Sequence, residues 1–219
     1  MSVESLVFII FGRLLVSIYI DVQLQDDETN LKTVDAIVII NGKEDVVYSK
    51  TVSLHLWLFG YELQDTAVVF CSQALYILSS KKKIEFLKPL ESLVVEDIRI
   101  KLLTRDPTDK DKASIDKLID AISKSKEGKN IGHFVRDKFG SDFAKLFVAA
   151  MKPKDFNFVD VSSVFSDLFA VKDIAEVDSI KKASEVTCTV FTKYLKEQIM
   201  DVIDEEKASL MLLSIWYKP

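Results

Sequence analysis

The chain has 219 residues, of which 48% are hydrophobic and 29% are charged. This balance predicts a folded globular protein and excludes a disordered or collagen-like chain. The formal net charge of -5 excludes the overall basic field of a dedicated DNA-binding module, so no direct sequence-specific nucleic-acid binding is expected, whereas basic partner proteins remain compatible.

The N-terminal segment from Ser5 to Ile20 is apolar, and we interpret its residues Phe11, Arg13, Leu14, Ile18 and Tyr19 as the first helix of the fold. A signal peptide or membrane anchor is less favoured, because Glu4 stands where a positively charged region is expected and Arg13 interrupts the apolar run. An anchored or secreted protein is kept as an alternative. Whether the mature chain begins near Met1 decides between the two interpretations.

Two strands are predicted around Asn41-Gly42, a dipeptide that suits the positive φ angles of a tight turn. Val34–Ile40 and Asp45–Ser49 flank this dipeptide, and they are expected to form a hairpin or a pair of edge strands. Next along the chain, Ser53 is predicted to cap a short helix that ends at Gly60.

The middle of the chain is predicted to alternate strands with amphipathic helices. In the helix expected from Ala113 to Lys126, aliphatic residues recur at helical spacing and mark a buried face. They are Ile115, Leu118, Ile119 and Ile122. The other predicted elements are strands at Thr66–Cys71, Ala74–Leu78, Val94–Leu103, Ile131–Val135 and Phe156–Val161, and helices at Ser80–Lys88, Ser141–Ala150 and Ser163–Phe169. This alternation predicts a three-layer α/β lobe on a mixed sheet.

The segment after this lobe has a different pattern. Asp173 and Glu176 have the spacing of a capping box, in which each side chain accepts a backbone N–H of the other residue. Apolar residues continue at helical spacing after them. One long amphipathic helix is therefore predicted from Ile174 to Ile203.

Residues suited to catalysis or metal binding are few. His55 and His133 are the only histidines, and neither stands at ligand spacing from another metal-binding residue, so both are interpreted as structural. Cys71 and Cys188 show no redox or metal spacing and are interpreted as small buried residues of a reducing compartment. A glycine-rich phosphate loop and a serine nucleophile elbow cannot be drawn either. The sequence thus predicts no enzyme, no catalytic or metal site and no cofactor.

Three charged runs have a structural and a functional interpretation. Lys81–Lys83 points to different sides of its helix and is interpreted mainly as solvated charge, with nuclear localisation or nucleic-acid contact as the alternative. The acidic runs Gln25–Glu28 and Asp201–Glu206 are likewise interpreted as solvated faces, with contact to basic partners as the alternative.

Ordered sequence blocks carry a family resemblance over residues 10 to 207. The aromatic run Trp57–Leu63 is by itself typical of core packing, but its order with the other blocks is specific. Those blocks are Val34–Val38, Thr66–Cys71, Ser79–Leu87, Lys129–Gly132, Leu168–Asp173 and Val202–Lys207. Together they resemble the N-terminal domain of the large subunit of the FACT histone chaperone, a non-catalytic branch of the creatinase and aminopeptidase P superfamily.

The resemblance implies a fold and a domain organisation. Residues 1–171 would form the three-layer, mixed-sheet N-terminal lobe, and residues 172–207 would form the first helix of a truncated second lobe of the pita-bread fold. Residues 208–219 depart from the family and are interpreted as a divergent tail.

The resemblance also implies a function, although it identifies no partner-binding residues. The expected function is a non-catalytic histone-binding module that acts in nucleosome disassembly and reassembly during transcription, DNA replication and repair. Core histones would be the direct partners, and the smaller HMG-box subunit of FACT would be reached through regions outside this sequence. The expected location is the nucleus, on chromosomes, with no membrane association.

The alternative function is the N-terminal lobe of an aminopeptidase P-like metallopeptidase. In those enzymes the metal ligands belong to the second lobe. A longer transcript that encodes the Asp, Asp, His, Glu, Glu ligand set would favour this alternative, and a continuation without the set would favour the chaperone.

Overall fold

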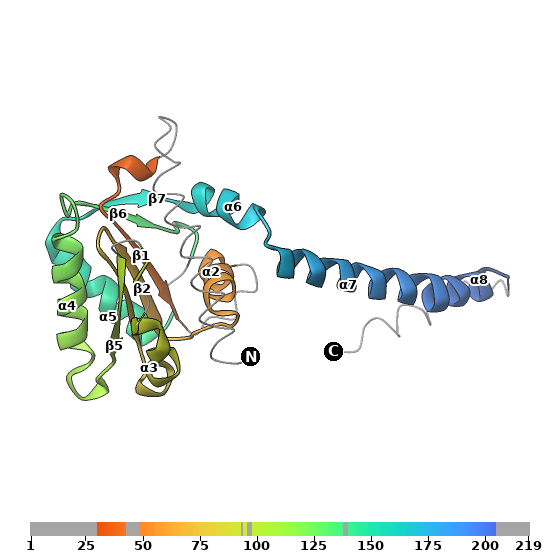
Figure 1. Ribbon diagram of the computed structural model, residues 1–219, viewed down its shortest axis with the longest axis horizontal. Helices are drawn as coiled ribbons and strands as arrows, with labels where there is room; N and C mark the ends of the chain where they lie inside the picture. The colour runs from red at the N-terminus through yellow and green to blue at the C-terminus, as the bar shows by residue number, and fades with distance from the viewer. Residues whose placement is uncertain (1–29, 43–48, 93, 96–97, 138–139, 205–219) are drawn as a thin grey trace. The chain divides into compact units, whose positions relative to one another are not determined.

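The computed structural model describes residues 30–42, 49–92, 94–95, 98–137 and 140–204 (Figure 1). The chain divides into two compact units, Met1–Ala170 and Val171–Pro219. The first unit contains the sheet, and the described part of the second unit is helical. Among the described residues, no helix combines the length and the apolar character needed to span a membrane.

Across the described ranges, seven strands form one mixed sheet in the first unit, in the order β4-β5-β3-β2-β1-β6-β7. β1, β3, β5, β6 and β7 run in one direction, and β2 and β4 run in the other. The strands are β1 (Ala36–Asn41), β2 (Thr66–Cys71), β3 (Ala74–Ser79), β4 (Val94–Val95), β5 (Ile98–Thr104), β6 (Asn130–His133) and β7 (Asn157–Asp160). The predicted mixed sheet is confirmed.

Helices cover both faces of this sheet, so the predicted three-layer α/β lobe is also confirmed (Figure 1). One face carries α2 (Lys50–Phe59), α3 (Lys81–Leu87), the 3-10 segment η2 (Lys88–Ser92) and α6 (Ser162–Ala170), and the other carries α4 (Lys112–Ser123) and α5 (Asp142–Met151). Short 3-10 turns, η1 (Asn30–Thr33), η3 (Pro107–Asp109) and η4 (Lys152–Lys154), complete the described connections.

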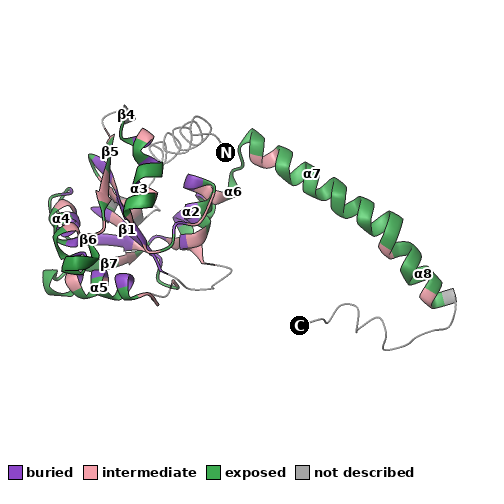
Figure 2. Cartoon of the chain, turned by 90° about the horizontal axis from the view of Figure 1, so that it is seen from below, coloured by how far each residue is buried: buried purple, intermediate pink, exposed green. Residues whose placement is uncertain are grey.

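The sheet separates two hydrophobic clusters, which Figure 2 shows as buried residues on both sides of the strands. Ile39 of β1 belongs to the cluster under α2 and α6, whereas Val38 and Ile40 belong to the cluster under α4 and α5. The aliphatic face predicted for α4 is buried as expected; its residues are Ile115, Leu118, Ile119 and Ile122.

β1 is a central strand, so the prediction of an edge strand at this position is wrong. It pairs antiparallel with β2 and parallel with β6, and both its faces are covered. Asn41 ends the strand in a buried position, and the predicted hairpin stays a prediction. The second predicted arm, Asp45–Ser49, lies outside the described residues except for Ser49.

The start of α2 also differs from the prediction. Ser49, not Ser53, is the N-cap, since its hydroxyl accepts the N–H of Val52 at 3.3 Å. Ser53 lies one turn inside the helix, where its hydroxyl donates to the Ser49 carbonyl. Gly60 ends the helix as predicted, with a left-handed φ of 74°.

The segment Val94–Leu103, which was predicted as one strand, contains two strands, β4 and β5. β4 pairs antiparallel with the start of β5, with Val94 opposite Arg99 and Val95 opposite Ile98. Only two residues separate the two strands, which is the spacing of a tight hairpin.

The long helix predicted for the second unit is confirmed over its described length. It consists of α7 (Ile174–Val190), the π-helical segment η5 (Phe191–Leu195) and α8 (Lys196–Asp204), which follow one another without a break. The predicted capping box is present: the Asp173 carboxylate accepts the Glu176 N–H at 2.8 Å, and the Glu176 carboxylate accepts the Asp173 N–H at 3.0 Å. No residue of α7 is buried within the described structure.

A buried carboxylate organises the turn between α4 and β6. Asp35 accepts backbone N–H groups from Glu127, Lys129 and Asn130 at 2.8 to 3.3 Å. Gly128, in the middle of this turn, has a φ of +66°, and a Cβ atom there would lie 2.1 Å from the carbonyl oxygen of Ser123. Only glycine fits this turn without displacing the backbone.

We expect Gly128→Ala to destabilise the first unit by about 2 kcal/mol, because it adds left-handed strain and a backbone clash at once. Urea unfolding followed by circular dichroism measures the change. The matched control is Glu127→Ala at the exposed neighbouring position, which should change stability by less than about 0.5 kcal/mol. Equal stabilities for the two variants would contradict this account of the turn.

Candidate functional site

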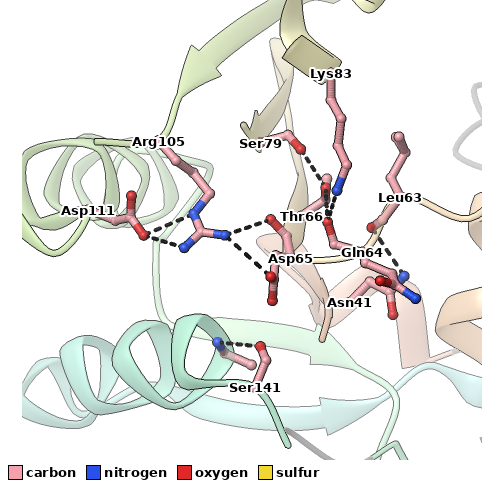
Figure 3. A network of polar contacts seen from close by, with 11 residues as sticks. Asn41, Leu63, Gln64, Asp65, Thr66, Ser79, Lys83, Arg105, Asp111 and Ser141 are labelled. Atoms are coloured by element: carbon pink, nitrogen blue, oxygen red, sulfur yellow. Dashed lines mark hydrogen bonds and ion pairs between the residues drawn. The ribbon is translucent and has the colours of Figure 1, made fainter. Parts of the chain in front are cut away.

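Polar side chains gather at the sheet edge where β1, β3 and β5 end. In open α/β sheets, this carboxyl edge is where ligand sites usually form. We name the group at this edge the carboxyl-edge network (Figure 3). It consists of Asn41, Asp65, Thr66, Ser79, Arg105 and Asp111.

Arg105 joins three elements of the network. It follows β5, and its guanidinium contacts the Asp111 carboxylate through Nε at 2.9 Å and through Nη2 at 2.8 Å. Nη1 donates to the carbonyl oxygen of Asp65, just before β2, at 3.3 Å. The guanidinium also lies 4.1 Å from the ring centre of Phe143 in α5, a cation–π contact.

Asp111 is the buried partner of this pair. Its side chain is 2% exposed, compared with 18% for Arg105. It occupies the N-cap position of α4 with a left-handed φ of 62°, but its carboxylate is turned to Arg105 and caps no N–H. Its Oδ1 atom is buried and makes no hydrogen bond to a described residue. The carboxylate therefore depends on Arg105 for its charge compensation.

Further hydrogen bonds connect the strand ends and the residues beside them. The Thr66 and Ser79 hydroxyl oxygens are 2.6 Å apart across β2 and β3. Asn41 at the end of β1 donates to the Leu63 carbonyl at 3.1 Å. The Lys83 ammonium donates to the carbonyl of Gln64 (Figure 3). These groups bond to one another across the edge, so their arrangement is that of a structural tie and not of an acid–base pair.

His55 lies in the hydrophobic core, as predicted for a structural residue. Its side chain is fully buried in α2, and its Nδ1 atom accepts the Leu63 N–H at 3.2 Å. Burial, with Lys83 acting in the same direction, lowers the pKa of His55 from 6.5 to about 3. The imidazole is therefore neutral at physiological pH, and its Nε2 atom carries the proton.

His133, at the end of β6, packs its ring against Phe158 of β7 at a centroid distance of 5.3 Å. Burial lowers the pKa of His133, and the nearby Asp160 carboxylate opposes this effect. Within the described ranges, no group of three or more His, Cys, Asp or Glu side chains is placed to hold a metal ion.

The two cysteines differ from each other. Cys71 is half-buried in β2, where burial raises the pKa of its thiol to about 11, so it is protonated at neutral pH and is a poor nucleophile. Cys188 in α7 is exposed, so the prediction that it is buried is wrong. The reason is that α7 packs no side chain into a core within the described structure.

The charged runs are distributed as follows. Lys81 and Lys82 are exposed, which agrees with solvated charge, whereas the half-buried Lys83 bonds to Gln64. Of the acidic runs, Gln25–Glu28 lies outside the described residues, and Asp201 is exposed in α8.

The aromatic run of α2 fills the core, as the structural interpretation predicted. Leu58 and Phe59 are about 1% exposed, and Trp57 packs against Phe169 of α6 at a centroid distance of 5.8 Å. After Gly60, Tyr61 packs edge-on against Phe86 of α3 at 5.5 Å.

The residues of the carboxyl-edge network carry no recognisable motif in the sequence. Arg105, Asp106 and Pro107 appear in the sequence as part of a charged loop with one proline. Asp65 is 40 residues before Arg105, and its left-handed φ of 50° has no local signature such as glycine. Only the pairing of β2, β3 and β5 brings these residues together.

Comparison with known proteins gives consistent results. A family model described as "FACT complex subunit SPT16 N-terminal lobe domain" matches residues 9–164. The FACT complex subunit spt-16 of Caenorhabditis briggsae is 37% identical over 182 residues, which cover 82% of this chain and 17% of that protein. The chain therefore spans about a sixth of the length of this relative.

Solved structures agree with this match. The N-terminal domain of FACT complex subunit SPT16 from Cicer arietinum has a TM-score of 0.79 and 28% identity, covering 91% of this chain and 46% of that one. The corresponding domain from Eremothecium gossypii has a TM-score of 0.68 at 22% identity, covering 93% and 45%, and supports the fold alone. The chain is thus similar to SPT16 N-terminal domains in sequence and in structure.

We expect Arg105→Met to destabilise the first unit by about 3 kcal/mol, since it leaves the Asp111 carboxylate buried and unpaired. Adding Asp111→Asn should recover part of this loss, because the amide carries no charge. Chemical unfolding of the variants measures both effects. As a control, Lys124→Met removes an exposed pair with Asp120 and should change stability by less than about 0.5 kcal/mol. A double variant as unstable as the sum of its single variants would refute the coupling.

We expect acidification to destabilise the first unit through His55. The unfolded state binds a proton near pH 6.5, whereas the folded state does so only near pH 3, so stability falls as the pH decreases between these values. Between pH 7.5 and pH 5.0 the loss from this group is about 2 kcal/mol. His55→Asn should remove this component and His133→Asn should leave most of it, as measured by urea unfolding at both pH values. An unchanged pH dependence in His55→Asn would exclude His55 as its source.

Proposed function

Because the chain belongs to the family of FACT complex subunit SPT16 N-terminal lobe domains, we propose that it is a non-catalytic module that binds core histones. The single observation that carries this proposal is the family match over residues 9–164. The structural likeness to the chickpea SPT16 N-terminal domain supports it independently, with a TM-score of 0.79.

The proposed role is a contribution to nucleosome disassembly and reassembly during transcription, DNA replication and repair. This role places the chain in the nucleus, on chromosomes. The relatives are named as subunits of a complex, which supports a place in a larger assembly. Contact with a smaller HMG-box subunit is proposed to involve regions of the longer relatives that this sequence does not contain.

The proposed mechanism is reversible docking between preformed surfaces. The net charge of -5 attracts basic histones and raises the rate of encounter. The buried Arg105–Asp111 pair and the bonds between strand ends keep the lobe rigid, so little conformational entropy is lost when a partner binds. Docking on a rigid frame favours selectivity, which generic charge attraction does not provide.

No observation favours the alternative, an aminopeptidase P-like metallopeptidase lobe. The matching family model and the curated relatives are FACT subunits by name. His55 is buried and neutral, and Cys71 is protonated at neutral pH, so neither of these side chains supplies hydrolytic chemistry.

The test is a pull-down of the purified full chain with core histones across a salt series. We expect retention of histones to persist above physiological ionic strength, about 0.15 M, because a shaped interface is screened less than separated surface charges. A globular acidic protein of the same size and net charge is the control. Its histone binding should be lost at lower salt.

Equal salt profiles for the chain and the control would overturn the proposal, since they would leave only generic charge attraction. A second arm adds polyglutamate as a competitor. A shaped surface should retain histones at polyglutamate concentrations that release them from the control protein.

A further inference from the structure

Within the described residues, the sheet has an edge that is unpaired over most of one strand. β4 pairs only with Ile98 and Arg99 at the start of β5. From Ile100 to Thr104, β5 has β3 on one side and no described strand on the other. We name residues 100–104 the β5 edge. Unpaired edges of this kind template the addition of a further strand.

The backbone orientation identifies which groups face outward at this edge. The Arg99 N–H donates to the Gln73 carbonyl in the turn before β3 at 3.2 Å, and the Arg105 N–H donates to the Ser79 carbonyl at the end of β3 at 2.8 Å. Because N–H groups alternate sides along a strand, those of Ile100 and Leu102 point away from β3. The β5 edge thus presents outward-facing N–H and C=O groups to an added strand.

The two faces of β5 differ in chemistry. Ile98, Ile100 and Leu102 face the cluster under α2 and α6, and they are buried or partly buried. Arg99 and Lys101 alternate with them on the opposite face, and both are exposed. A strand added at this edge would therefore meet apolar side chains on one face and, on the other, the cations of Arg99 and Lys101 followed by the half-buried Leu103.

Lys101 is held in place on its face. Its ammonium donates to the Tyr76 hydroxyl at 3.2 Å and lies 5.1 Å from the centre of that ring. Tyr76 is directly opposite Lys101 in the register of β3 and β5. The positive charge is therefore positioned by the fold, and less side-chain entropy is lost when a carboxylate binds to it.

We propose that the β5 edge binds an extended peptide as an additional strand, in which acidic residues alternate with apolar residues. Main-chain hydrogen bonds to Ile100 and Leu102 supply affinity. Carboxylates next to Arg99 and Lys101, and apolar side chains beside Ile100 and Leu102, supply specificity.

The charges at the β5 edge favour an acidic peptide over two other candidate partners, a second copy of the chain and nucleic acid. A second copy of the chain, paired edge to edge, would bring the cations at Arg99 and Lys101 of both copies together, which is unfavourable. Nucleic acid would contact a chain with a net charge of -5, and its backbone cannot continue a β-ladder. An acidic peptide can both continue the β-ladder and place carboxylates next to the cations.

The test is fluorescence anisotropy with the full chain and a labelled peptide of about eight residues that alternates valine and glutamate. We expect saturable binding. Three control peptides should bind at least about tenfold more weakly: one with the same composition in two blocks, one that alternates valine and lysine, and one that is N-methylated on alternate amides. The N-methylated peptide removes the ladder and leaves the protein unchanged.

Variants of the chain separate the contribution of the cations from that of the main-chain hydrogen bonds. Arg99→Glu with Lys101→Glu should weaken binding by at least about tenfold. The matched control is Lys152→Glu with Lys154→Glu, which makes the same charge change at exposed lysines before β7, at the opposite edge of the sheet, and should leave binding unchanged. Leu102→Pro removes an outward N–H and should abolish binding, with circular dichroism to verify the fold.

Absence of saturable binding by the alternating peptide overturns the proposal. It is also overturned if the N-methylated peptide binds equally well, or if the control variant loses as much affinity as Arg99→Glu with Lys101→Glu. Because histones are not used, failure here leaves the proposed histone binding untouched, and failure of the histone pull-down leaves this proposal untouched.

Discussion

Strand β1 is covered on both faces, and the architecture of the first unit depends on this burial. Its run of aliphatic residues, Ala36 to Ile40, offers no polar face to water, so both faces must be covered. α2 and α6 cover one face and α4 and α5 cover the other, while β2 pairs along the whole of β1 and β6 pairs with Ala36 and Ile37. The two clusters, the three layers and the placement of β6 after a long excursion of the chain all follow from this requirement.

Local sequence pattern predicted which segments form helices and strands better than it predicted which elements pair with one another. The buried face of α4 and the capping box at Asp173 depend on residues within one or two helical turns, and both are present. The edge-strand prediction failed because Asn41-Gly42 has the composition of a tight turn, while the true partner of Ala36 is Ile131, far along the chain.

Ser49 and Ser53 are equally good caps by composition. Ser49 has the additional tie that its hydroxyl donates to the Asp137 carboxylate at 3.0 Å, a contact no local pattern contains.

The candidate site was less predictable than the fold for a related reason. Arg105 and Asp111 are ordinary surface residue types in a charged loop, and their pairing becomes apparent only when β5 ends beside β2 and the start of α4. In the sequence, the histidines and cysteines are residue types that can catalyse reactions or bind metals. Burial makes this chemistry unavailable at His55 and Cys71, because it stabilises their neutral forms. Cys188 was misjudged because burial of a helix depends on what packs against it, which one amphipathic pattern does not specify.

The described polar groups at the carboxyl edge bond to one another, which directs attention to the sheet edges as surfaces for binding. The two edges of this sheet are not equivalent. β7 has four residues and ends at Asp160, whose carboxylate accepts the Ser162 N–H, so its edge is short and acidic at one end. β5 has seven residues with Arg99 and Lys101 on one face, and it is cationic in a chain whose net charge is negative. A local field opposite in sign to the overall charge lets one lobe attract basic partners over its surface and still select an acidic strand at one edge. Binding of an acidic strand at the β5 edge would therefore depend on the cations at Arg99 and Lys101, and not on the net negative charge that is proposed to attract histones.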